Sequence, residues 1–358
     1  MTNPTSNGLE GVVVADTAIS EVDGERGHLV IAGSDVERLA LSTTFEDAVA
    51  QVLTAGGARI SSLLLGALGA ARASAWELVP RLGDALALPE AMDALRTSLG
   101  HLRPSGDDLA DALAAIGAAP VFVAAWNRTR SGTAQIAPDP ALSHAADYLR
   151  MSTGTAPSPA AAKALDAYLV TVIDHGMSAS TFTARVITST GSDLISAMVG
   201  GVGALKGPLH GGAPGPVLDM LDAVGTPANA EPWILAELAA GRRIMGMGHR
   251  IYRVRDPRAA VLETAVRPHA SRRLEMARAV ETAASKILHE KKPDRPLAAN
   301  VEFYTAVLLD AVGLPREQFS ATFAVSRVAG WSAHVIEQRR TGRLIRPASR
   351  YVGVAPAA

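Results

Sequence analysis

The sequence contains no cysteine and few aromatic residues. The absence of cysteine among its 358 residues excludes disulfides, thiolate metal sites and a cysteine nucleophile. Aromatic residues make up only 4%, whereas alanine is abundant, and this balance favours closely packed helices over a β-sandwich or a barrel. With 48% hydrophobic and 19% charged residues, the chain has a globular composition and is long enough for two domains.

Excess charge and long apolar runs are lacking as well. The formal net charge is −1, so no global basic field indicates nucleic acid, and anion recognition would depend on local arginine clusters. No uninterrupted apolar run reaches about 18 residues, and Met1–Asn7 lacks the basic-then-apolar pattern of a signal peptide. These absences predict a soluble, cytoplasmic protein without a membrane or nucleic-acid partner.

Helices dominate the predicted secondary structure. One hairpin is expected near the N-terminus, with Val12–Val14 and His28–Ile31 as its strands. Thr44, Ser158 and Asn300 are predicted to cap helices. The helical segments are expected near 45–54, 61–79, 89–100, 107–117, 118–129, 159–175, 180–190, 193–205, 301–311 and 326–339. The predicted fold class is therefore nearly all-α, with a small N-terminal β-hairpin.

Three histidines adjoin glycines and are candidates for chemistry. His175 and His249 each neighbour a glycine, and His210 lies in the turn Gly207–Gly212. Glycine lets such a turn adopt positive φ and lets a ligand approach the main chain closely. Taken alone, the turn around His210 favours the interpretation as a solvent-exposed loop histidine. Their spacing matches no zinc motif, so no metal is expected.

Charged residues near these turns are the other candidates. Arg258 follows Asp256-Pro257, a turn that could direct its side chain inward, and Glu302 lies in the first turn of a predicted helix. Helix N-terminal amides favour an ionised carboxylate, as a general base requires, although an acidic first turn is also ordinary helix chemistry. Guanidinium groups suit carboxylates and phosphates, but an arginine cluster is also typical of a salt-bridged surface.

Together, these residues resemble the citrate synthase family. The matching segments, in chain order, are His175–Arg185, Gly203–Gly212, Gly246–Arg258, Asn300–Tyr304, Ser326–Trp331 and Leu344–Pro347. The resemblance covers most of the chain and implies a mostly helical homodimer. It also implies that residues 1–211 and 309–358 form a large domain and residues 212–308 a small one. The active site would lie in a cleft between them that closes on substrate.

The resemblance implies an activity and a role for each residue. Such enzymes condense the acetyl group of acetyl-CoA with oxaloacetate and hydrolyse citryl-CoA to citrate and CoA, with no metal and no permanently bound cofactor. His210 matches the histidine that stabilises the enol, His249 the one that polarises the oxaloacetate carbonyl, and Glu302 the position of the base. His175, Arg258 and Arg327 match oxaloacetate-binding positions. Arg346 matches an arginine that reaches the site of the other subunit. Two further positions, Arg253 and Lys206, are assigned to CoA.

One position departs from the family, and it leaves alternatives open. The family's usual base is aspartate, whereas Glu302 is one methylene longer, about 1.5 Å, and a misplacement of about 1 Å can cost on the order of 100-fold in rate. We expect the surrounding backbone to compensate, because both histidines and the oxaloacetate arginines remain. The alternatives are a 2-methylcitrate synthase that uses propionyl-CoA and a catalytically silent regulator that binds CoA or a dicarboxylate. A pocket distinguishes one methylene by only about 1–3 kcal/mol.

Overall fold

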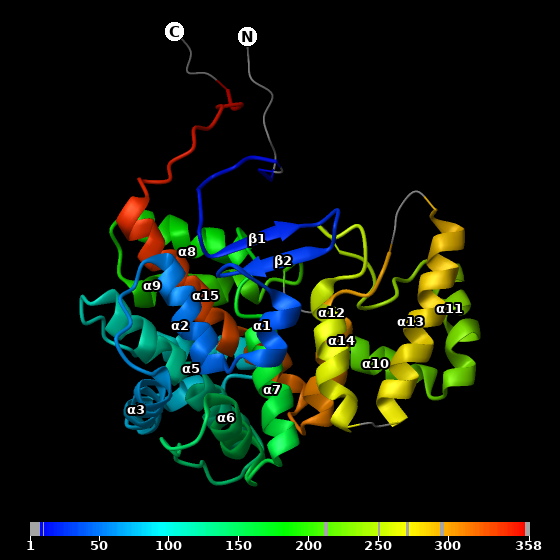
Figure 1. Ribbon diagram of the computed structural model, residues 1–358, viewed down its shortest axis with the longest axis horizontal. Helices are drawn as coiled ribbons and strands as arrows, with labels where there is room; N and C mark the ends of the chain where they lie inside the picture. The colour runs from blue at the N-terminus through cyan, green and yellow to red at the C-terminus, as the bar shows by residue number, and fades with distance from the viewer. Residues whose placement is uncertain are drawn as a thin grey trace.

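The chain folds into packed helices with a small sheet laid across them (Figure 1). The computed structural model describes residues 8–9, 11–210, 214–249, 251–269, 272–293 and 297–354. The strands are β1 (Ser20–Asp23), β2 (His28–Ile31) and β3 (Ser34–Asp35). The α-helices are α1 (Val36–Ser42), α2 (Phe45–Gly56), α3 (Leu64–Trp76), α4 (Ala91–Leu99), α5 (Asp108–Arg130), α6 (His144–Thr153), α7 (Pro159–Thr171), α8 (Ala179–Ser189), α9 (Leu194–Leu205), α10 (Pro214–Val224), α11 (Ala230–Ala239), α12 (Pro257–Val266), α13 (Arg272–Lys291), α14 (Val301–Ala311) and α15 (Phe319–Thr341).

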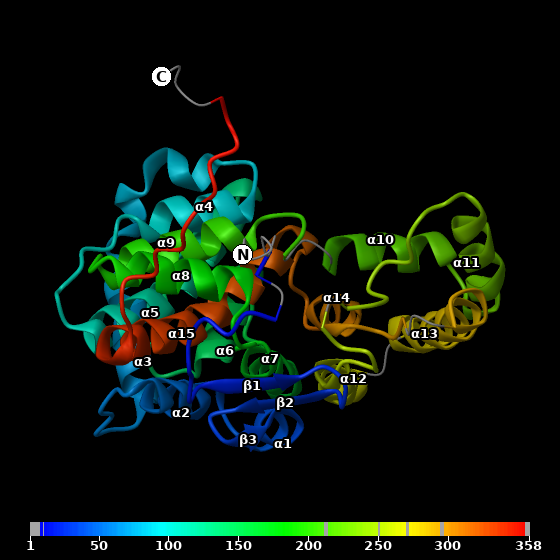
Figure 2. The same cartoon turned by 90° about the horizontal axis from the view of Figure 1, so that it is seen from above.

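Two groups of helices lie side by side. In Figure 2, α10, α11 and α13 project from the larger body that contains α2 to α9 and α15. Helix α14 contacts α7 as well as α10 and α13, so it joins the two groups, and α12 packs against α1, α7 and α14. The predicted domain boundary at 211–212 falls on residues outside the described ranges, as do Gly211, Gly212 and Arg250.

Predicted helix starts agree with the capping hydrogen bonds. The side chain of Thr44 accepts from the backbone N–H of Asp47 at 3.2 Å, and that of Ser158 accepts from Ala161 at 3.1 Å. Asn300 begins α14 in the same way. Each side chain satisfies an amide that has no partner within the helix. The mainly helical fold class predicted from the sequence is confirmed.

The predicted hairpin is present, but its first strand was wrongly placed. The strand that pairs with β2 is Ser20–Asp23, not Val12–Val14, and β3 adds a third strand that the sequence analysis missed. Val13 is 84% exposed, whereas Leu29 and Ile31 are buried in the core. The carboxylate of Asp23 accepts the N–H groups of the two turn residues Glu25 and Arg26, which fixes the turn after β1.

Helices α5 and α15 are longer than predicted. The predicted break between 117 and 118 is wrong, because α5 continues through Pro120. An internal proline costs about 3 kcal/mol, but α5 is packed by α3, α4, α6 and α15, and burial of its apolar side chains offsets that cost. The length and apolar character of α5 would suit a membrane span, yet most of it is buried inside the protein, as expected for a core helix. Helix α15 begins at Phe319, seven residues before the predicted start.

Helix α15 positions the turn that carries His175. Gly330 lies so close to this turn that an added Cβ would meet the carbonyl oxygen of Ile173 at 2.2 Å. The prediction that His175 ends a helix is wrong, because α7 ends at Thr171 and His175 follows in the next turn. This turn is held from the other side by Ser20 of β1. The Ser20 hydroxyl donates to Asp174 at 2.5 Å and accepts from the Gly176 N–H at 2.9 Å.

Candidate active site

Three turns bring the candidate histidines together. His175 follows α7, His210 follows α9, and His249 precedes α12. The ring centroids of His175 and His249 are 5.7 Å apart, in an edge-on arrangement. The positive charges of Arg258 and Arg327 and the rings of His249 and His210 all act on the pKa of His175. The five groups therefore surround one site.

His249 is held as a neutral imidazole with one defined tautomer. Its Nδ1 accepts from the backbone N–H groups of Ile251 and Tyr252 at 3.0 and 3.1 Å. Since those groups can only donate, the ring proton lies on Nε2. Burial, with a further contribution from Arg258, lowers the pKa of His249 to about 4. The ring is thus a neutral N–H donor at physiological pH.

His210 has the opposite tautomer for the same reason. Its Nε2 accepts from the backbone N–H of Ser180 at 3.1 Å and lies 2.8 Å from the Ser180 hydroxyl. The ring proton is therefore on Nδ1. Burial lowers the pKa of His210, so this ring too is a neutral donor. The Nε1–H of Trp331 on α15 donates to the same serine hydroxyl at 3.2 Å, which orients Ser180.

His175 is buried and contacts Tyr252. Its Nε2 lies 3.0 Å from the Tyr252 hydroxyl. Burial, with Arg258 and Arg327, lowers the pKa of His175 well below its ordinary value. All three candidate histidines are therefore neutral.

Glu302 supplies a carboxyl with a free oxygen. It lies in the first turn of α14, where its backbone N–H donates to the Asn300 side chain at 3.0 Å. Its Oε2 is buried and has no hydrogen-bond partner among the residues that the structure describes. Burial raises the pKa of Glu302 to about 7, and the positive charge of Arg258 opposes that shift. A carboxyl of this kind is a stronger base than an exposed glutamate.

Asp256 connects Arg258 to the start of α14. Its carboxylate binds the Arg258 guanidinium through Nε at 3.0 Å and Nη2 at 2.8 Å. The same carboxylate caps α12 and accepts the backbone N–H of Val301 at 3.1 Å. One buried acid therefore fixes the arginine and the helix turn that carries Glu302.

Arg327 is the second buried arginine of the site. Its Nε donates to the carbonyl oxygen of Val172 at 2.8 Å, and its guanidinium lies 4.6 Å from the ring centroid of Phe323. Its Nη2 has no partner within the described part of the chain. Burial lowers the pKa of Arg327 to about 10, so the group remains charged at neutral pH. It can donate to an anionic ligand.

The remaining three predicted residues lie apart from this cluster. The Lys206 ammonium pairs with Asp93 of α4 at 2.5 Å. Arg253 is about half exposed, and its Nε lies 3.9 Å from a carboxylate oxygen of Glu25 in the hairpin turn. Arg346 is exposed in the C-terminal tail and lines a pocket together with Leu9, Val12, residues 14–18 and the end of α15.

Sequence analysis missed four groups that support the site. Ser180 and Tyr252 fix histidine tautomers, and Asp256 and Asp174 lie beside the two arginines. Although burial pushes the pKa of Asp174 upward, His334 and Arg327 hold it at about 2. Asp256 had a signal, because aspartate before proline is a typical helix start. For Ser180 and for the hydroxyl of Tyr252 we find no signal, since their partners His210 and His175 are distant in sequence.

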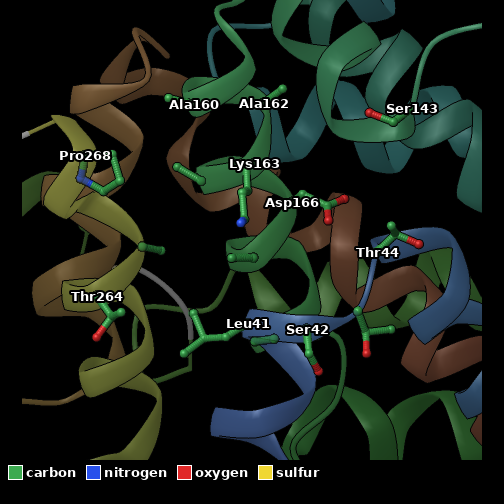
Figure 3. A pocket seen from close by; sticks show the side chains of 15 residues that line it. Leu41, Ser42, Thr44, Ser143, Ala160, Ala162, Lys163, Asp166, Thr264 and Pro268 are labelled. Atoms are coloured by element: carbon green, nitrogen blue, oxygen red, sulfur yellow. The ribbon is translucent and has the colours of Figure 1, made fainter.

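A separate pocket of about 600 Å³ lies between α1, α7 and α12. Figure 3 shows Lys163 of α7 directed toward Leu41, and Asp166 of the same helix on the side of Thr44. Burial raises the pKa of Asp166 to about 7, and the Phe45 N–H donates to this carboxyl at 3.1 Å. The lining contains none of the histidines or arginines described above.

Comparison with known proteins shows the family to which the chain belongs. Residues 8–348 match the family described as "Citrate synthase, C-terminal domain". The chain belongs to the citrate synthase family and is an enzyme of the acyltransferase type.

Several relatives in this family align along nearly their whole length. A protein named "Putative citrate synthase 2" from Mycobacterium tuberculosis is 39% identical, covering 98% of this chain and 93% of its own. A citrate synthase from Deinococcus radiodurans is 37% identical (97% and 96% covered), and a 2-methylcitrate synthase from Mycobacterium tuberculosis is 36% identical (99% and 93% covered).

Solved structures of the family have the same fold. The citrate synthase of Thermotoga maritima superposes with a TM-score of 0.85 at 34% identity, covering 99% of this chain and 98% of its own. That of Thermoplasma acidophilum, a ternary complex with carboxymethyl coenzyme A and oxaloacetate, gives a TM-score of 0.86 at 27% identity, covering 100% and 98%.

Proposed function

We propose that this enzyme condenses the acetyl group of acetyl-CoA with oxaloacetate and hydrolyses the resulting citryl-CoA to citrate and CoA. One observation carries the proposal: a buried carboxyl with a free oxygen, Glu302, shares a site with three neutral histidines and two buried arginines. Proton abstraction next to a thioester carbonyl needs a base and a donor for the developing enolate oxygen.

The proposed division of labour follows from these protonation states. Glu302 removes a proton from the thioester methyl group, and Nδ1–H of His210 donates to the thioester oxygen where negative charge develops. Nε2–H of His249 donates to the oxaloacetate carbonyl and makes its carbon more electrophilic. Neutral donors suit both tasks, because they stabilise an oxyanion without depending on an acidic pH.

Oxaloacetate carries two carboxylates, and His175, Arg258 and Arg327 are the groups we assign to them. The free Nη2 of Arg327 is a donor available to an incoming carboxylate. Arg258 is already bound on one edge by Asp256, which leaves its other N–H groups for substrate. Closure of residues 212–308 onto residues 1–211 and 309–358 would exclude water before condensation.

CoA and the second subunit complete the proposal. We assign Arg253 to the CoA phosphates, since its guanidinium is about half exposed and it follows His249 closely in the chain. Lys206 is a weaker assignment because Asp93 already pairs with it. Arg346 acts in the site of a partner subunit, so the active enzyme is a homodimer.

The alternative is an enzyme that uses propionyl-CoA and forms 2-methylcitrate. A relative 36% identical is named 2-methylcitrate synthase, and it favours a test of propionyl-CoA in place of acetyl-CoA. One methylene changes binding by about 1–3 kcal/mol, so the ratio of kcat/KM for the two thioesters decides between them.

Substitution of Glu302 tests the proposed mechanism. We expect Glu302→Gln to lose about 100- to 10,000-fold in kcat, because it cannot accept the proton. Glu302→Asp should lose about 100-fold, since its shorter side chain retracts the carboxylate in a site built for glutamate. Glu290→Gln, an exposed change on α13, is the matched control and should retain full activity. Failure of the wild type to form citrate or methylcitrate would refute the proposed function.

A further inference from the structure

Tyr252 contacts three groups of the site at once. Its hydroxyl lies 3.0 Å from Nε2 of His175, and its backbone N–H donates to Nδ1 of His249 at 3.1 Å. The guanidinium carbon of Arg258 lies 5.8 Å from the centroid of its ring. The side chain is only 2% exposed, so these contacts are not made by a mobile surface residue.

The contact to His175 differs in kind from those that fix the other two histidines. Backbone N–H groups determine the tautomers of His210 and His249, because an amide can only donate. A tyrosine hydroxyl can donate or accept, so its partner's tautomer depends on the direction of one hydrogen bond.

The surroundings of the hydroxyl decide that direction. Burial raises the pKa of Tyr252, so its oxygen keeps the proton, and His175 carries a single ring proton because its own pKa is lowered. Among the described residues, Nε2 of His175 is the one acceptor within hydrogen-bonding distance of this hydroxyl. If His175 donated instead, the buried hydroxyl hydrogen would have no acceptor there, which is costly.

We propose that Tyr252 is a positioning residue whose hydroxyl donates to Nε2 of His175 and so fixes the proton of that ring on Nδ1. No described residue hydrogen bonds to Nδ1, which is thus available as a donor to a carboxylate. The consequence for oxaloacetate binding rests on the proposed function; the tautomer does not. All three histidines would then present one N–H each to an anionic substrate.

The tautomer can be measured without turnover. Nitrogen-15 NMR of histidine-labelled enzyme distinguishes protonated from unprotonated ring nitrogens, and a His175→Gln sample assigns the signals. In wild type we expect Nδ1 of His175 to be protonated and Nε2 unprotonated. In Tyr252→Phe, which retains the ring over Arg258, we expect a shift towards the other tautomer or a mixture of both.

Kinetics give the second readout. Loss of a defined donor should raise KM for oxaloacetate roughly tenfold, while kcat and KM for the thioester change less than about threefold. The control is Tyr148→Phe, which removes another buried hydroxyl, 2.8 Å from that of Thr322, outside the site. It should leave KM for oxaloacetate unchanged.

Each outcome has one meaning. A proton on Nε2 of His175 in wild type overturns the proposal, as does an unchanged tautomer and KM in a folded Tyr252→Phe. If that variant does not fold, the wild-type spectrum alone decides. The expected tautomer in an enzyme that makes no citrate or methylcitrate would support the role of Tyr252 and refute the proposed function instead.

Discussion

At the scale of single residues, Glu302 combines a functional task with a cost in stability. Its folded-state pKa of about 7 lies above the ordinary value of about 4.3. The fold therefore favours the protonated form. The stabilising contribution of that proton is fully present below about pH 4 and is lost as pH rises through 7. At pH 8 the buried carboxylate lowers the free energy of unfolding by up to about 3 kcal/mol.

Glu302→Gln should consequently be more stable than wild type at alkaline pH. We expect a gain of about 1–3 kcal/mol in the free energy of unfolding at pH 8, because the amide carries no charge to bury. At pH 4.5 the two proteins should differ by less than about 0.5 kcal/mol, since both are then neutral at this position. Urea denaturation at the two pH values measures the difference, with Glu290→Gln as the exposed control. An equal effect at both pH values would contradict the raised pKa.

At the scale of elements, local signals predicted where helices begin, and distant contacts decided the rest. Thr44, Ser158 and Asn300 cap their helices as expected, because a cap is a contact between residues two or three positions apart. Pro120 indicated a break, yet packing on α5 overrode it. Val12–Val14 has strand propensity, but Val12 and Val13 are exposed and Val14 is only partly buried. Local sequence does not show which segments will be buried by residues distant in the chain.

In the candidate site, too, only residues in recognisable local segments could be predicted. Its histidines, arginines and Glu302 could be identified because each stands in a recognisable short segment. Tyr252 and Ser180 could not, because they act through hydrogen bonds to His175 and His210, 77 and 30 positions away. Nor could the sequence predict that burial would leave all three histidines neutral.

Gly330 allows α15 to pack on the His175 turn, and this contact can be tested. An added methyl group would overlap the Ile173 carbonyl and approach Asp174 to 2.8 Å. We expect Gly330→Ala to lower the free energy of unfolding by about 3 kcal/mol and to raise KM for oxaloacetate. Gly66→Ala on α3 is the matched control, because its methyl group would meet no atom within 4 Å. The control should gain up to about 1 kcal/mol. Equal stability of the two variants would contradict close packing of α15 on this turn.

At the scale of the whole molecule, the positive charge of the site is local. Arg258 at the start of α12 and Arg327 on α15 are both buried, in a chain whose net charge is −1. An anionic substrate would therefore be recognised by fixed guanidinium groups and not by a general basic field. Arg346 is the one assigned oxaloacetate-site arginine outside this cluster, and its place in the exposed tail raises the question of which subunit it serves.

Mixing two inactive variants answers that question. Arg346→Ala lacks the tail arginine and Glu302→Gln lacks the base, so each homodimer should be inactive. If Arg346 serves the partner, a mixed dimer contains one intact site, formed by Glu302 of one subunit and Arg346 of the other. Random exchange at equal amounts gives about half mixed dimers, each with one of two sites active, so about a quarter of wild-type activity should return. If Arg346 serves its own subunit, every site lacks one group and no activity returns. Light scattering before and after mixing verifies that the species are dimers.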